Sequence, residues 1–167
     1  MNLLFRRALL GIFLLFGSCA AGASWKEIPF PKPLPRAEAV LLAEASAEAC
    51  DFQVDRMESD PSGGEIVTLW KERLAPFGKG HRLKLHVRLQ PGEEGKVRGL
   101  EFYVERQVNE SMEAPFAPRP EDWGNGGQDP GAEALFETHV ATRLRSYFQG
   151  SWKGGEKPPK RSLFPDR

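Results

Sequence analysis

The stretch HRLKLHVRLQ, residues 81–90, decides the fold of this chain. Its apolar residues at positions 83, 85, 87 and 89 alternate with the polar residues Lys84, His86, Arg88 and Gln90. Successive side chains of a β-strand point to opposite faces of the sheet. The stretch therefore predicts a strand with one buried face and one solvated face.

A second strand, KVRGLEFYVERQVNE at residues 96–110, follows the turn-rich residues 91–95. Its apolar residues at positions 100, 102, 104 and 108 share one parity, whereas Val97 has the other. Gly99 is the predicted site of a bulge that absorbs this slip. The two stretches predict an antiparallel hairpin.

One register of this hairpin satisfies both faces of the sheet. With Leu89 opposite Leu100, the charged face pairs Arg88 with Glu101, His86 with Tyr103 and Lys84 with Glu105. Opposite charges across a ladder favour such a register. These polar side chains have two possible roles: an ordinary solvated face, or a binding face for a partner.

Shorter signals on either side complete the set of elements. Residues 52–55 and 65–71 alternate with period two and predict two further strands. Residues 37–49, AEAVLLAEASAEA, predict a helix in which Val40, Leu41 and Ala45 share a face. A second helix starts at Asp129 and Pro130, and its apolar stripe falls at positions 136, 140, 144 and 148.

The order helix, four strands, helix predicts an α+β two-layer sandwich. In this arrangement a four-stranded antiparallel meander carries both helices on one sheet face. The predicted divisions are a signal peptide at 1–18, a lipidated Cys and Pro-rich tether at 19–36, the α+β domain at 37–150 and a disordered basic tail at 151–167.

The N-terminus has the anatomy of an export signal. Arg6 and Arg7 precede an apolar run, and no acidic residue occurs before Glu27. The run is too short and too interrupted for a membrane-spanning helix. Two cleavage sites compete: one directly before Cys19, and one after the A-x-A sequence that ends at Ala23.

The tether is predicted from four alternating prolines, at positions 29, 31, 33 and 35. Proline fixes φ and lacks a backbone donor, so an extended polyproline-like spacer is expected here rather than a packed element.

Composition excludes several functional classes. The chain carries 23 basic and 23 acidic residues, and removal of residues 1–18 with their two arginines leaves 21 against 23, a net charge of −2. Such a balance is not that of a nucleic-acid-binding protein. Cys50 has no partner cysteine whichever cleavage site is used, and it is expected to be buried and inert.

No arrangement of catalytic or metal-binding residues stands out. His81 and His86 point to opposite faces of one strand, and His139 lies on a distant helix. The sequence contains no GxSxG elbow, phosphate loop or calcium loop. We therefore expect no metal, no cofactor and no catalysis.

The remaining candidate site is the long Pro- and Gly-rich segment at residues 112–133. Loops of this length tend to be functional or disordered. Trp123, with Phe116 nearby, is a candidate contact for a partner. The alternative is that Trp123 folds back to cap the open edge of the core.

Phe16-Gly17-Ser18-Cys19 resembles the bacterial lipobox, in which small residues directly precede a lipidated Cys, although Phe16 stands where Leu is usual. With the proline tether, the order of elements resembles the helix-grip domains of lipoproteins from the outer-membrane barrel-assembly machinery. It is also similar to small uncharacterised bacterial lipoproteins with a "VERQVN"-like strand. These resemblances carry location and architecture, and no functional residue.

The resulting expectation is a non-catalytic envelope lipoprotein that binds a protein partner. Acyl chains such as palmitate on Cys19 would anchor it in a membrane, and Ala20, where an inner-membrane retention signal would place Asp, favours the outer membrane facing the periplasm. Its candidate partner-binding residues are Trp123, Phe116, Lys84, His86, Arg88 and Tyr103. The alternative is a free periplasmic or secreted domain that binds a ligand or acts as a weak hydrolase.

Overall fold

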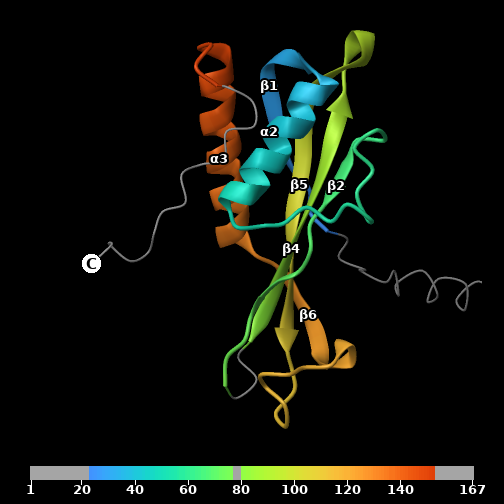
Figure 1. The fold of residues 1–167 in the computed structure, drawn as a ribbon, viewed down its shortest axis with the longest axis vertical. Coiled ribbons are helices and arrows are strands. Elements are labelled where there is room, and N and C mark those ends of the chain that lie inside the picture. Colours follow the sequence, from blue (N-terminus) through green and yellow to red (C-terminus); the bar gives the residue numbers. More distant parts are fainter. Residues whose placement is uncertain (1–22, 77–79, 153–167) are drawn as a thin grey trace, which may run out of the picture.

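The computed structural model describes residues 23–76 and 80–152, which form an α+β two-layer sandwich (Figure 1). Within these residues an open antiparallel sheet has six strands, and helices α2 and α3 lie on one of its faces. The predicted fold class is confirmed. The strand order is β1-β5-β4-β2, with β3 beside β4 and β6 beside β5.

The central hairpin consists of β4 (His81–Pro91) and β5 (Lys96–Asn109), joined through the 3-10 turn η1 (Glu93–Gly95). The predicted register is confirmed, with Leu89 opposite Leu100 and His86 opposite Tyr103. A register shift follows Gln90, next to Gly99. A Cβ on Gly99 would lie 2.8 Å from the carbonyl oxygen of Ile28, so glycine is what allows the neighbouring strand to approach.

That neighbouring strand is β1 (Lys26–Pro35), and it corrects the prediction of a polyproline spacer. Ile28, Phe30 and Leu34 alternate along it and are buried in the core. The prolines are tolerated because β1 is an edge strand, where one side of the backbone needs no partner. The Pro-rich segment is therefore part of the domain.

The opposite edge is shorter than predicted. The single strand expected at residues 65–71 is divided into β2 (Glu65–Val67) and β3 (Lys71–Arg73), both paired with β4. The strand expected at residues 52–55 is reduced to an isolated bridge between Val54 and Thr68. This segment still lies along β2, because Asp55 N donates to the carbonyl oxygen of Val67 at 2.9 Å.

The long loop predicted at residues 112–133 contains a further strand. After the 3-10 turn η2 (Pro120–Asp122), β6 (Trp123–Gln128) pairs with the end of β5. Its glycines allow close packing, since a Cβ on Gly126 would come within 3.1 Å of the Arg106 Cγ atom. The loop prediction was wrong here because glycine has low intrinsic strand propensity, which tertiary pairing overrides.

Helices α2 (Arg36–Ala49) and α3 (Pro130–Phe148) close the core. Asp129 caps α3 as predicted by accepting a hydrogen bond from Ala132 N at 2.9 Å. On α3, Phe136, Val140 and Leu144 are buried, whereas Phe148 is 40% exposed. On α2 the predicted face was wrong: Leu41 is 41% exposed, and the buried residues are Ala39, Leu42, Ala43, Ser46 and Ala47.

Three predictions concern residues outside those that the structure describes. They are the signal peptide at 1–18, lipidation at Cys19 and the disordered tail, of which only residues 151 and 152 are described. Trp152 packs against the core, so the domain reaches slightly beyond its predicted end at residue 150. Cys50 is buried as expected, and burial raises the pKa of its thiol to about 11.

Candidate interaction face on the sheet

The candidate site is the sheet face that points away from the helices, here called the outer face. It is built by one parity of the central hairpin, so that β4 presents Arg82, Lys84, His86 and Arg88. Opposite them β5 presents Glu101, Tyr103, Glu105 and Gln107. The strands fix these side chains in two parallel rows, because every second residue is held on the core side.

At one end of the outer face, Arg82 lies between two tryptophans. Its guanidinium carbon is 4.4 Å from the ring centre of Trp70 and 4.5 Å from that of Trp123. The Nε and Nη2 atoms of Arg82 donate to Gln107 Oε1 at 2.9 and 2.7 Å. Cation–π contact and hydrogen bonding therefore hold both indoles in fixed positions.

At the other end, three rings are in contact. Trp25 meets Tyr103 edge-on, with ring centres 4.6 Å apart, and Tyr103 stacks on His86 with an interplanar angle of 6°. The guanidinium carbon of Arg88 lies 4.2 Å from the ring centre of Trp25. Lys84 lies between the two ends, with its Nζ 5.3 Å from the Trp70 ring.

These side chains form a continuous row that we call the aromatic stripe. Its members are Trp25, Trp70, Arg82, Lys84, His86, Arg88, Tyr103 and Trp123. All five rings in it are half-buried, and none belongs to the hydrophobic core cluster. The stripe is thus ordered by contacts among its own members and remains partly open to solvent.

The charges of the stripe are compensated within the domain. Lys84 Nζ lies 2.6 Å from Glu58 Oε2. His86 Nε2 is within hydrogen-bond distance of Glu105 Oε2, at 3.3 Å. Arg88 and Arg82 face Glu65 and Glu72 at 3.5 and 3.8 Å. The outer face therefore presents aromatic surface with paired charges rather than a field of one sign.

The histidine of the stripe is neutral at neutral pH. Burial lowers the pKa of His86 below its ordinary value, and this effect outweighs the hydrogen bond to Glu105, which favours the charged form. Burial likewise raises the pKa of Tyr103. Both rings are thus uncharged where they stack.

The structure brings together five of the six predicted site residues. Lys84, His86, Arg88 and Tyr103 form one group, and Trp123 joins them through Arg82. Trp123 therefore lies on the outer face, and the alternative that it caps the core is wrong. Phe116 is 62% exposed in the loop after β5 and makes none of the ring contacts found in the described part of the chain.

Three members of the stripe were missed in the sequence. Arg82 shares the parity of Lys84, so the alternation itself contained the signal. Trp70 directly precedes β3, and Trp25 directly precedes β1. Their positions follow from the pairing of β1 and β3 with the hairpin, which the local sequence pattern does not encode.

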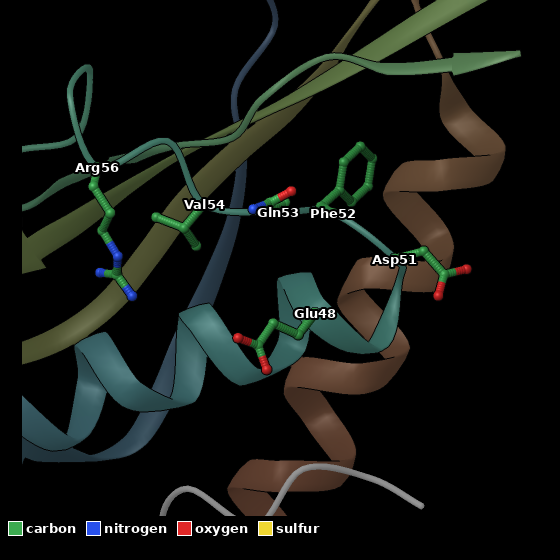
Figure 2. Close-up of a pocket in the computed structure, with 6 residues that line it drawn as sticks. All are labelled: Glu48, Asp51, Phe52, Gln53, Val54 and Arg56. Carbon is green, nitrogen blue, oxygen red and sulfur yellow. The ribbon is translucent and has the colours of Figure 1, made fainter. Parts of the chain in front are cut away.

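An open depression of about 510 Å³ lies at the end of α2, beside the segment that follows it (Figure 2). It is lined by Glu48, Asp51, Phe52, Gln53, Val54 and Arg56. Figure 2 shows the carboxylate of Asp51 directed away from Glu48 and Arg56. Arg56 is paired with Glu44, at 3.2 Å between Nη2 and Oε2, so the polar groups do not converge on one point.

Comparison with models of known protein families finds no match for this sequence, and comparison with curated proteins finds none either. No helix among residues 23–76 and 80–152 is long and apolar enough to cross a membrane. In the same residues, no three His, Cys, Asp or Glu side chains are grouped as a metal site would require.

Proposed function

We propose that this chain is a non-catalytic envelope lipoprotein that works as a protein-interaction or assembly module. Its Cys19 carries the lipid anchor in the outer membrane, and its domain faces the periplasm. The signal-like residues 1–18 and the lipobox-like sequence before Cys19 support this location. The order of elements predicted from the sequence, which resembles that of barrel-assembly lipoproteins, suggests the role.

The observation that carries the proposal is the aromatic stripe. Tryptophan, tyrosine and arginine are the residues that contribute most to binding energy at protein interfaces. Here Trp25, Trp70 and Trp123 lie on one sheet face, and each is held by an arginine. Because the rings are fixed before binding, little of this domain's conformational entropy is lost when a partner binds them.

A small-molecule function has less support. Ligand sites are concave and combine apolar walls with a few convergent polar groups. The depression beside α2 is open, and its charged side chains diverge (Figure 2). The outer face is instead suited to a partner with a broad surface of its own.

The test is capture of the partner by the lipidated protein from detergent-solubilised envelope. The stripe variant Trp25→Ala/Trp123→Ala removes two half-buried rings, and Phe148→Ala, which removes an exposed ring from α3, is the control. We expect the wild type and Phe148→Ala to capture the same protein and the stripe variant to lose it.

Thermal unfolding of all three proteins shows whether each variant is folded. The two tryptophans lie outside the core cluster, so their loss should leave the fold intact. Retention of the same partner by a folded stripe variant would refute the outer face as the binding surface.

A further inference from the structure

The sheet extends beyond the helices. Figure 1 shows β6 and the adjoining ends of β4 and β5 projecting away from α2 and α3 as a single layer. We call this projection, which also includes β3, the arm. Its outer face carries Trp70, Arg82 and Trp123, whereas its inner face continues the side that the helices cover elsewhere.

The inner face of the arm is formed by Lys71, Arg73, His81, Leu83, Arg106 and Val108. The pairing of the strands places Arg73 opposite His81, His81 opposite Val108, and Leu83 opposite Arg106. All except Lys71 and Arg73 are half-buried, and Leu83 packs against the core where the arm begins. This face therefore combines two apolar side chains with four basic ones.

Lys71 pairs with Asp51 Oδ2 at 3.6 Å, whereas the other three basic side chains lack such partners. Among the described residues, no carboxylate lies within ion-pair distance of Arg73, His81 or Arg106. The Nε atom of Arg106 is buried and has no hydrogen-bond partner. Buried hydrogen-bond donors nearly always have an acceptor in native proteins, so the unpaired Nε–H of Arg106 calls for an explanation.

The pKa of His81 reflects the positive charge around it. Burial lowers the pKa of His81 first, and the nearby Arg106 and Arg73 lower it further, against a smaller opposing effect of Asp129. Gly126 adds no side chain beside Arg106, whose Cγ atom lies 3.1 Å from where a Cβ would be. The space that the Arg106 stem occupies is thus provided by β6.

We propose that the inner face of the arm docks an acidic segment of a partner protein. Carboxylates of that segment pair with Arg73 and Arg106, and its apolar side chains cover Leu83 and Val108. A second copy of this chain is disfavoured, because two such faces would bring like charges together. The chain's own residues 151–167 carry five basic and two acidic side chains, so they are not the acidic segment either.

This docking surface lies opposite the aromatic stripe and requires no lipid anchor. Its test is therefore separate from the test of the proposed function. The probe is a phage-displayed library of random twelve-residue peptides, selected on the immobilised full chain. The double variant Arg73→Gln/Arg106→Gln is selected in parallel. The control Arg98→Gln/Arg145→Gln removes the same amount of charge from two exposed arginines on β5 and α3.

We expect peptides selected on the wild type and the control to be enriched in Asp and Glu relative to the unselected library. The consensus peptide should bind the double variant about tenfold more weakly or worse, since a charge-assisted hydrogen bond contributes at least that factor. On the wild type, its addition should shift the NMR signals of Leu83 and Val108.

Two results would overturn the proposal. One is a selection without acidic enrichment on the wild type, or with equal enrichment on the double variant. The other is a set of NMR shifts confined to Trp70 and Trp123 on the outer face. The NMR result uses the wild-type protein alone, so it holds even if the double variant folds poorly.

Discussion

Arg82 organises its end of the outer face through contacts with both tryptophans and with Gln107. A buried cation–π contact contributes about 0.5–2 kcal/mol, and a hydrogen bond to a charged group contributes a similar amount. Arg82→Ala should therefore lower the free energy of unfolding by about 1–3 kcal/mol in urea denaturation. The exposed Arg98→Ala should change it by less than about 0.5 kcal/mol. Equal effects of the two changes would show that the tryptophans are not held by Arg82.

His86 makes the stability of the domain depend on pH. Its pKa is lower in the folded state than in the unfolded chain, so the unfolded chain binds more protons as the pH falls below about 6.5. The folded state should lose stability between pH 7 and pH 5. His86→Phe keeps a ring against Tyr103 and removes the titration, so its loss of stability over this range should be smaller. Urea denaturation of both proteins at several pH values measures the difference, and identical slopes would contradict the lowered pKa.

At this scale the sequence predicted the polar row of β4 better than its aromatic neighbours. Lys84 and His86 follow from alternation alone, since their strand is long and regular. Trp25 and Trp70 reach the same face only because β1 and β3, which follow them, pair with the hairpin. Such pairing depends on tertiary contacts between residues far apart in the sequence.

Among the elements, β1 and β6 show where local pattern and tertiary structure disagree. The hairpin of β4 and β5 was predicted with its register, because apolar parity and charge pairing agreed. The prolines of β1 and the glycines of β6 oppose strand structure locally. Both segments are strands because β5 is long enough to pair with both along one of its edges. The shared parity of Ile28, Phe30 and Leu34 contains the period of β1, whereas β6 carries no such signal.

The contact between β1 and β5 depends on Gly99. A methyl group there would lie 2.8 Å from the carbonyl oxygen of Ile28 and 2.9 Å from Gln90 Oε1, so one strand must move. Gly99→Ala should lower the free energy of unfolding by about 1–3 kcal/mol. Gly131→Ala, in the first turn of α3, meets only an ordinary contact of 3.4 Å and should be neutral or slightly stabilising. Thermal melts of the two variants compare them, and a neutral Gly99→Ala would contradict the close approach.

For the whole molecule, the proposed anchor and the domain are close in sequence. Only five residues lie between Cys19 and Trp25, the ring that meets Tyr103 edge-on. Strand β1 begins directly after Trp25, at Lys26. The segment predicted as a tether is strand β1 of the sheet. The domain is therefore expected to lie near the membrane rather than on a long stalk.

Lipidation at Cys19 should place the protein in the membrane fraction, since two or more acyl chains give stable attachment. Cys19→Ala should leave soluble protein or an uncleaved precursor. Mass spectrometry of the mature N-terminus tests this, with a diacyl- or triacyl-modified Cys19 as the expected result. A mature chain that starts at unmodified Ser24 would show that the anchor does not exist.

The most direct test of the outer face as the binding surface is site-specific photo-crosslinking in the cell that makes the protein. A photoreactive phenylalanine analogue replaces Trp25 in the aromatic stripe or, as the control, the exposed Ala141 on α3. We predict that irradiation yields an adduct of one defined size from position 25 and none from position 141. An adduct of equal yield from both positions, or none from position 25, would contradict the account.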